Sequence, residues 1–224
     1  MKTEKTKNSK ICFIYGASDI SGTPFLPDKN RGDIVVAADA GLEFLKKSGI
    51  SPDFILGDFD SLGHAVQGEN VLTFPSEKDD TDTGLSVDLG ISKGADVFVI
   101  YGGLGGRRQD HTIANFQLLA HISGMGKRGF LVDKDTVFTV IENSQIHFGK
   151  ELSGYISVFC MGDSADGVNI KGLKYTVTDA HLDFRTALGV SNEFLSREAM
   201  ISVEKGVLLI NFSDPEFSPF KYLG

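Results

Sequence analysis

Residues 33–60, DIVVAADAGLEFLKKSGISPDFILGDFD, decide the fold that we expect for the first half of the chain. The apolar runs IVVAA and FILG, near the two ends of this stretch, have the length and composition of buried strands. Between them, AGLEFLKKSG carries apolar residues at helical spacing and stops at Gly49, with Pro52 just beyond. A strand, a helix and a strand in this order predict a βαβ unit, whose strands lie parallel in one sheet.

The same alternation of apolar runs and helical segments continues up to about residue 135. It predicts further strands at ICFIYG (11–16) and DVFVIYGG (96–103), and helices within 81–94 and 110–124. We therefore predict an α/β domain with a mostly parallel sheet over residues 1–142.

The second half of the chain has a different pattern, because the helical period disappears from about Thr136. Short β-branched or aromatic runs follow one another instead: TVFTVIE, QIHFG, YISVFCM, GVNIKG, KYTVTDA, MISVEKG and VLLINF. These runs predict an all-β domain, an antiparallel sandwich or barrel, over residues 143–224. We place the boundary where ENSQ (142–145) interrupts the apolar pattern.

The composition excludes several classes of protein. The 224 residues include 30 acidic and 22 basic ones, and the formal net charge of -8 argues against a surface for nucleic acid or an anionic membrane. Cys12 and Cys160 lie inside apolar runs, so we expect reduced core thiols. The first apolar run, ICFIY, ends at Gly16 and is too short for a signal peptide or a membrane span. We therefore expect a cytoplasmic protein.

Acidic residues follow two of the expected strands, at the edge where open parallel sheets bind ligands. Asp39 comes directly after VVAA, and Asp58 and Asp60 lie in GDFDS after FIL. Alternation along an extended chain points both GDFD carboxylates to one side, where they repel each other unless a cation lies between them. Magnesium fits, because it binds one or two carboxylates together with water and phosphate oxygens. A solvated turn is the alternative interpretation.

A third acidic cluster, EKDDTD (77–82), precedes a predicted helix. Asp80 or Thr81 can cap this helix, and Asp82 would lie in its first turn. Taken alone, the cluster fits helix capping better than metal binding. Lys78 can either reach a phosphate or balance the neighbouring aspartates, and the sequence leaves both roles open.

A glycine-rich turn, GGLGGRRQDH, lies between the strand DVFVIY and the next helix. Glycines let backbone N–H groups approach phosphates closely, and the start of a helix adds a positive dipole end. The residues that could bind phosphate here are Gly103, Gly105, Gly106, Arg107, Arg108 and His111. The turn matches neither a Rossmann fingerprint nor a Walker A loop, and a tight connection with two solvated arginines is the alternative.

The order of these motifs resembles the thiamine pyrophosphokinase family over nearly the whole chain. The resemblance is carried by DAG (39–41), SPDFILGDFDSL (51–62), KDDTD (78–82), the R-x-D-H element at 108–111, and GLKY with SNEF in the second half. It implies an α/β nucleotide-binding domain followed by a β domain. It also implies an enzyme that uses ATP and Mg²⁺ to convert thiamine into thiamine diphosphate, with release of AMP.

The resemblance further implies roles for single residues. The expected magnesium ligands or their immediate neighbours are Asp58, Asp60 and Asp82, with Asp39 close by. Arg108 and Asp110 would position the ATP phosphates and the attacking hydroxyl, and either Asp82 or Asp110 would accept the proton. An in-line displacement needs no nucleophilic residue, and neither cysteine has an activating context.

In the family, thiamine lies in a cleft that the β domain of a partner subunit completes, so the resemblance implies a homodimer. Tyr175, Ser191 and Asn192 would contact thiamine, with Tyr175 stacking on the cationic ring. An ordinary strand position for Tyr175 is the alternative. Two features depart from the family: GGRRQDH adds Arg107 beside the expected arginine, and the chain contains no tryptophan.

Two other functions remain open from the residues alone. A magnesium-dependent phosphohydrolase acting on a nucleotide or a sugar phosphate would also carry D-x-D after a parallel strand. A non-catalytic, dimeric metabolite-binding protein would keep the fold without turnover. Release of AMP that depends on thiamine would distinguish the pyrophosphokinase from both.

Overall fold

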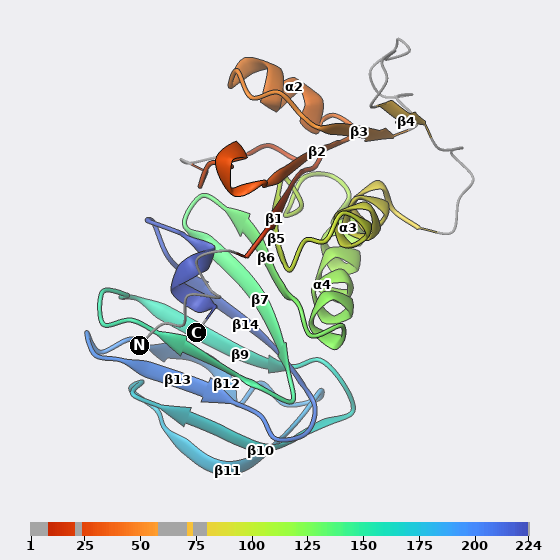
Figure 1. The fold of residues 1–224 in the computed structure, drawn as a ribbon. Coiled ribbons are helices and arrows are strands. Elements are labelled where there is room, and N and C mark those ends of the chain that lie inside the picture. The colour runs from red at the N-terminus through yellow and green to blue at the C-terminus, as the bar shows by residue number, and fades with distance from the viewer. Residues whose placement is uncertain (1–8, 21–23, 58–70, 74–79, 224) are drawn as a thin grey trace. The chain divides into compact units, whose positions relative to one another are not determined.

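The computed structural model describes residues 9–20, 24–57, 71–73 and 80–223 (Figure 1). Its residues form two compact units, which are described separately. The N-terminal unit comprises residues 8–115 and 131–134, and the C-terminal unit comprises residues 116–130 and 135–224. The helix α4 (Gln109–Gly124) and the strand β6 (Arg128–Asp133) each begin in one unit and end in the other.

The N-terminal unit contains a parallel sheet. Its strands, in spatial order, are β5 (Val97–Tyr101), β1 (Ile11–Tyr15), β2 (Ile34–Ala38), β3 (Phe54–Gly57) and β4 (Val71–Thr73). Every neighbouring pair among them is parallel. The remaining elements of this unit are the 3-10 turn η1 (Lys29–Arg31) and the helices α2 (Gly41–Lys47) and α3 (Asp82–Ser92). The central strands are buried along their whole length, as expected for a sheet that is covered on both faces.

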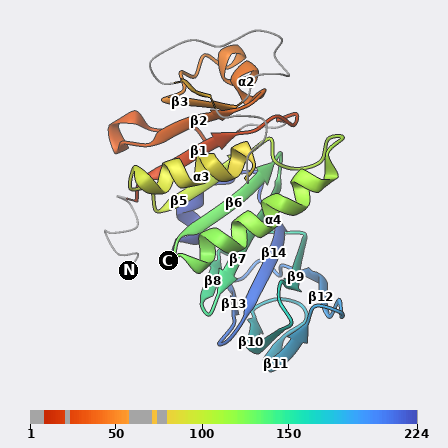
Figure 2. The ribbon, with the colours of Figure 1, turned by 90° about the vertical axis from the view of Figure 1, so that its right-hand side faces the viewer.

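Helices α2 and α3 cover opposite faces of this sheet. On one face, Phe44 of α2 stacks on Tyr15 with ring centroids 5.6 Å apart. On the other face, α3 packs so closely that a Cβ atom on Gly90 would lie 2.8 Å from Cys12 Sγ. Cys12 and Tyr15 are three residues apart on β1, so their side chains point to opposite faces. Figure 2 shows α3 lying along the strands that it covers.

The C-terminal unit contains two antiparallel sheets. One has the order β12 (Gly189–Glu193), β9 (Tyr155–Cys160), β14 (Val207–Ser213) and β7 (Thr136–Glu142). The other has the order β11 (Val177–Asp183), β10 (Ser164–Lys171), β13 (Ala199–Ser202) and β8 (Gln145–Phe148). A 3-10 turn, η3 (Pro219–Tyr222), follows β14.

Aromatic rings join the two sheets of the C-terminal unit. Phe148 on β8 lies against Phe212 on β14 with ring centroids 5.2 Å apart, and Tyr222 packs on Phe212 at 5.0 Å. The buried carboxylate of Asp214 accepts hydrogen bonds from the Tyr222 hydroxyl, at 2.6 Å, and from Lys221 Nζ, at 2.9 Å. These contacts hold η3 against the core between the sheets.

The expected strands and helices are confirmed in both halves, but three strands were not predicted: β4, β6 and β12. Strand β12 lies at the edge of its sheet, where little of it needs to be buried, and this explains its polar sequence GVSNE. The run predicted at 174–180 begins later, because β11 starts at Val177. Parallel pairing covers β1 to β5, but β7, which also lies within residues 1–142, pairs antiparallel with β14. The mostly parallel sheet is therefore confirmed only in part, and the boundary between residues 142 and 143 stays a prediction.

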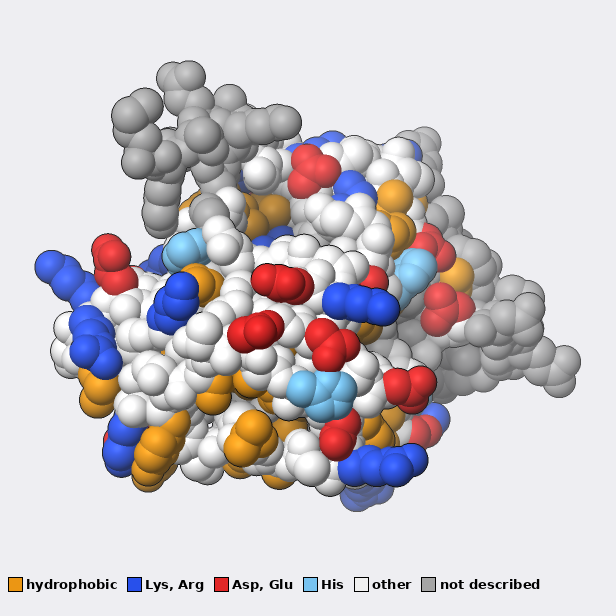
Figure 3. Space-filling view, turned by 90° about the horizontal axis from the view of Figure 1, so that it is seen from below, with side chains coloured by type: hydrophobic (Ala, Val, Ile, Leu, Met, Phe, Trp, Pro, Cys, Tyr) orange, Lys and Arg blue, Asp and Glu red, His pale blue; other side chains and the backbone are white. Residues whose placement is uncertain are grey.

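Expectations from composition can also be checked. Cys12 and Cys160 are both free and buried, and burial raises the pKa of the Cys12 thiol, which favours the protonated, unreactive form. The face of the molecule in Figure 3 shows acidic side chains gathered around a histidine, with lysine and arginine side chains toward the margins. In the part of the chain that the structure describes, no helix has both the length and the apolar character that crossing a membrane requires.

Candidate functional site

A cavity of about 450 Å³ lies at the carboxyl ends of β1, β2 and β5 in the N-terminal unit. Its lining consists of Gly16, Ala17, Ser18, Asp19, Ala38, Asp39, Asp82, Thr83, Gly102, Gly103, Gly106, Arg107, Arg108, His111 and Asn115. Ligand sites commonly have this size, and parallel sheets commonly place them at this edge. The polar residues that follow the strands in the sequence therefore share one cavity.

Most of the expected site residues in the first half of the chain line this cavity. They are Asp39, Asp82, Gly103, Gly106, Arg107, Arg108 and His111. Gly105 and Asp110 are described by the structure but do not line it. Asp58 and Asp60, expected as magnesium ligands, lie outside the described residues.

Two loops join at the floor of the cavity, one after β1 and one after β5. Gly16 N–H donates to Tyr101 O at 2.7 Å, and Ser18 N–H donates to Gly102 O at 3.0 Å. A Cβ atom on Gly102, whose φ is +67°, would lie 2.6 Å from Gly16 O, so only glycine allows this approach. The loop after β1 was not among the predicted site segments. The sequence signal that could have identified this loop is the small-residue run Gly16–Ala17–Ser18 directly after a buried strand.

The DAG motif bends the chain sharply after β2. Asp39 has a φ of +51°, and its N–H donates to Leu56 O at 2.9 Å. Gly41 starts α2 so close to β1 that a Cβ atom there would lie 1.8 Å from Tyr15 O. The Asp39 carboxylate in turn lies over Gly57, where a Cβ atom would be 2.5 Å from Asp39 Oδ1. The carboxyl end of β3 therefore lies directly beside the carboxylate of Asp39.

The start of α3 separates the capping residue from the residue that lines the cavity. Thr81 is the N-cap, and its hydroxyl accepts a hydrogen bond from Gly84 N–H at 3.0 Å. The Asp80 carboxylate accepts one from Thr81 N–H at 2.6 Å. Asp82 lies in the first helical turn and lines the cavity. Capping therefore accounts for Thr81 and leaves Asp82 at the site.

The cavity carries the type of donor that magnesium prefers, from Asp19, Asp39 and Asp82. Within residues 9–20, 24–57, 71–73 and 80–223, however, no three His, Cys, Asp or Glu side chains lie close enough together to hold a metal ion. The described carboxylates thus fit Mg²⁺ in chemistry, because this ion needs only one or two carboxylates and takes its other ligands from water and phosphate.

Arg108 and Asp110 form an exposed ion pair beside the cavity. Arg108 donates to the Asp110 carboxylate from Nε, at 3.0 and 3.1 Å, and from one terminal nitrogen, at 2.7 Å. The hydrogen bond from Arg108 lowers the pKa of Asp110 to about 2. Such a carboxylate is a weak base. Asp110 therefore orients Arg108, which itself lines the cavity together with Arg107 and His111.

The residues expected at a thiamine site lie together in the C-terminal unit. Asn192 is buried, accepts a hydrogen bond from Tyr175 N–H at 2.9 Å and donates to Tyr175 O at 2.6 Å. Tyr175 precedes β11 and is 61% exposed, so it is not an ordinary strand residue. Ser191 is exposed, and its N–H donates to Ser157 Oγ at 3.1 Å. Asn192 thus holds the backbone of the loop that presents the ring of Tyr175.

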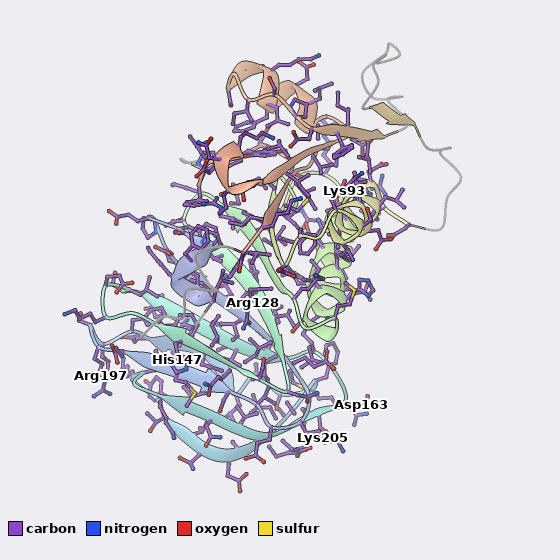
Figure 4. The ribbon with its side chains drawn as sticks, viewed as in Figure 1. Lys93, Arg128, His147, Asp163, Arg197 and Lys205 are labelled. Atoms are coloured by element: carbon purple, nitrogen blue, oxygen red, sulfur yellow. The ribbon has the colours of Figure 1, made fainter. Side chains whose placement is uncertain are left out.

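Two cations lie at the same loop, GLKY (172–175): Arg197 contacts it from outside, and Lys174 belongs to it. Arg197, labelled in Figure 4, donates from Nε to Gly172 O at 3.1 Å. Lys174 pairs with Glu193 at 2.5 Å, and its Nζ lies 5.5 Å from the centre of the Tyr175 ring. The Tyr175 ring therefore already has a cation near it, as expected for a ring that attracts positive charge.

The fold and the cavity together define a class of protein. A parallel α/β unit with a glycine-rich turn, two arginines and several aspartates at its strand ends is suited to phosphoryl transfer, and a β-sandwich unit is attached to it. Two family models agree with this class: "Thiamin pyrophosphokinase, catalytic domain" matches residues 29–128, and "Thiamin pyrophosphokinase, vitamin B1 binding domain" matches residues 143–208. The chain belongs to the thiamin pyrophosphokinase family.

Similar proteins support this assignment. A thiamine pyrophosphokinase of Bacillus subtilis is 28% identical over 182 residues, which cover 78% of this chain and 85% of that protein. The crystal structure of thiamine pyrophosphokinase from Bacillus subtilis, at 25% identity, matches with a TM-score of 0.78 over 91% of this chain and 99% of the other. That of the Geobacillus thermodenitrificans protein, at 26% identity, matches with a TM-score of 0.72 over 92% and 98%. The resemblance found in the sequence is therefore confirmed.

Proposed function

We propose that this protein transfers the pyrophosphoryl group of ATP to the hydroxyl of thiamine, giving thiamine diphosphate and AMP. The observation that carries the proposal is the strand-end cavity, in which Asp39, Asp82, Arg107, Arg108 and His111 meet. All five residues fall within the segment that matches the catalytic domain of the family. The β-sandwich unit contains the segment that matches the vitamin B1 binding domain.

The ATP phosphates would bind at the glycine-rich turn. Gly102, Gly103 and Gly106 bring backbone to the cavity wall, and α4 begins at Gln109, directly after Arg108. The start of a helix attracts anions because its first N–H groups have no partner within the helix. Arginine adds a planar set of donors that suits phosphate oxygens. We assign phosphate binding to Arg107, Arg108, His111 and these glycines.

Mg²⁺ would lie at the neighbouring strand ends. Asp58 and Asp60 follow Gly57 in the sequence, Gly57 lies against the Asp39 carboxylate, and Asp82 lines the same cavity. We assign Asp58 and Asp60 as the direct ligands, with Asp82 and Asp39 as their immediate neighbours. A bound Mg²⁺ would neutralise charge on the transferred group.

The reaction is a single in-line displacement. The thiamine hydroxyl oxygen forms a bond to the β-phosphorus of ATP, the bond from that phosphorus to the oxygen shared with the α-phosphate breaks, and AMP leaves. The hydroxyl proton goes to a carboxylate. Asp110 is poorly suited, because pairing with Arg108 lowers its pKa to about 2. We therefore assign proton acceptance to Asp82, which lines the cavity.

Thiamine would reach the cavity in a homodimer, in contact with Tyr175, Ser191 and Asn192. Support for a second copy comes from exposed apolar side chains between residues 155 and 195 of the C-terminal unit. They are Tyr155, Tyr175, Phe184, Leu188, Val190 and Leu195. Such side chains are typical of an interaction site where they lie side by side on one surface. The Tyr175 ring suits the cationic thiamine ring, which would compete with Lys174 for it.

The decisive experiment is an assay for AMP and thiamine diphosphate from ATP, Mg²⁺ and thiamine. Asp82→Asn should lower the rate of AMP formation by at least about 100-fold, the usual size of a general acid–base contribution. Asp88→Asn is the matched control, because Asp88 is exposed on the same helix and does not line the cavity. A wild-type rate in Asp82→Asn would refute its role.

The same assay separates the alternatives. A phosphohydrolase would release phosphate from a nucleotide or sugar phosphate without thiamine. A metabolite-binding protein would bind ATP or thiamine in a calorimeter and produce no AMP.

A further inference from the structure

Three side chains of α4 each hydrogen-bond to the backbone of the glycine-rich turn. Gln109 Nε2 donates to Gly106 O at 2.8 Å. Thr112 Oγ1 accepts from Gly105 N–H at 3.0 Å. Asn115 Nδ2 donates to Gly103 O at 2.8 Å. Gln109, Thr112 and Asn115 are spaced three residues apart, so neighbouring members lie on the same side of the helix.

The turn needs such contacts because its own backbone is permissive. Gly102, Gly105 and Gly106 all have positive φ, at +67°, +67° and +75°. Glycine loses more conformational freedom than other residues when it is held in one conformation. A turn with three such residues would sample many shapes without anchors. The hydrogen bonds from α4 select one of them.

Asn115 is the most confined of the three anchors. It is 4% exposed, and a Cβ atom on Gly103 would lie 2.9 Å from its Nδ2 atom. Asparagine is a poor helix former, and a buried amide requires hydrogen-bond partners. The bond to Gly103 O supplies one partner, and Asn115 also lines the cavity. The turn is therefore pressed against a polar group at the cavity wall.

Thr112 determines the direction of one backbone group. Its hydroxyl accepts the N–H of Gly105, so this N–H points to α4, and Gly105 does not line the cavity. The neighbouring Gly103 and Gly106 do line it. The anchors thus decide which parts of the turn face a ligand.

We infer that Gln109, Thr112 and Asn115 are positioning residues, which hold the glycine-rich turn and the two arginines after it in the shape that binds the phosphates of ATP. This inference rests on the proposed function and adds residues to it. Pre-ordering a flexible turn lowers the entropic cost of binding, so loss of an anchor should weaken ATP binding. It should leave the KM for thiamine unchanged.

The test compares Thr112→Val with Thr112→Ser in the full-length protein. Valine keeps the shape of threonine without the hydroxyl, and serine keeps the hydroxyl. Thr112→Val should raise the KM for ATP about fivefold, the size expected when one hydrogen bond between exposed groups is lost. Thr112→Ser should stay within about twofold of the wild type. Melting temperatures of the two variants should agree within about 3 °C.

A second pair tests the helix start. Gln109→Ala removes a donor to the turn, and Gln117→Ala removes an exposed glutamine further along α4. Only Gln109→Ala should raise the KM for ATP. Equal values of this KM for Thr112→Val and Thr112→Ser, or for Gln109→Ala and Gln117→Ala, would overturn the inference.

Calorimetry with a non-hydrolysable ATP analogue and Mg²⁺ separates this inference from the proposed reaction. If the wild type binds the analogue but forms no AMP with thiamine, the proposed reaction is wrong. Weaker binding by Thr112→Val than by Thr112→Ser would still support the positioning role. Equal binding by these variants, or no binding by the wild type, would overturn it.

Discussion

Replacing Gly57 with alanine tests the packing of the Asp39 carboxylate against the end of β3. A Cβ atom at this position would lie 2.5 Å from Asp39 Oδ1, whereas ordinary van der Waals contact begins at 3.4 Å. The carboxylate or the backbone must therefore move by about 0.9 Å. Misplacement of a catalytic site by about 1 Å can cost about 100-fold in rate. We expect Gly57→Ala to lower the rate of AMP formation by about this factor.

The assay measures AMP release at saturating ATP, thiamine and Mg²⁺, together with the melting temperature. Gly94→Ala is the control, because Gly94 also has a positive φ, +81°, but nothing lies within 4 Å of an added Cβ atom. Both variants should lose about 1 kcal/mol of stability from the backbone conformation, and only Gly57→Ala should lose activity. A rate within threefold of the wild type in Gly57→Ala would refute the reasoning.

Two further predictions concern titration and stability. The carboxyl group of Asp110 should titrate in an NMR experiment with a midpoint near pH 2; the pair with Arg108 is fully present above pH 3.8, the ordinary value, and is lost as the pH falls through 2. A midpoint at 3.8 would contradict the pairing. Tyr222→Phe should lower the free energy of unfolding by about 1–2 kcal/mol in urea, because the buried Asp214 loses a hydrogen bond. Tyr155→Phe, at an exposed tyrosine, should change it by less than about 0.5 kcal/mol, and an equal loss in both would contradict this account.

The local sequence pattern was sufficient to predict the strands that bury a continuous apolar run. ICFIY and VFVIY are fully buried, and their composition alone predicted strands. Pattern was insufficient for β12, whose polar sequence GVSNE forms a strand because β9 offers it hydrogen-bond partners. Pairing of this kind depends on a neighbour in space, which a single segment does not reveal.

The same distinction holds for the candidate site. Polar residues after strands predicted Asp39, Arg107 and Arg108, because the ends of parallel strands meet at one edge. Asp82 was expected only from the resemblance to the family. Asn192 was expected to contact thiamine. The structure adds that its side-chain amide accepts a hydrogen bond from the N–H of Tyr175 and donates one to the carbonyl oxygen of Tyr175. An asparagine between polar neighbours gives no sign of which backbone groups it will meet.

The sequence by itself determined the class of fold, the order of the motifs and the family, because periodicity and motif order are properties of the linear chain. Only the tertiary structure decided how the site is assembled. Asp39 lies over Gly57, the loop after β1 bonds to the loop after β5, and three side chains of α4 hold the glycine-rich turn. These contacts act over about 3 Å between segments that the folded backbone brings together, so local composition does not encode them.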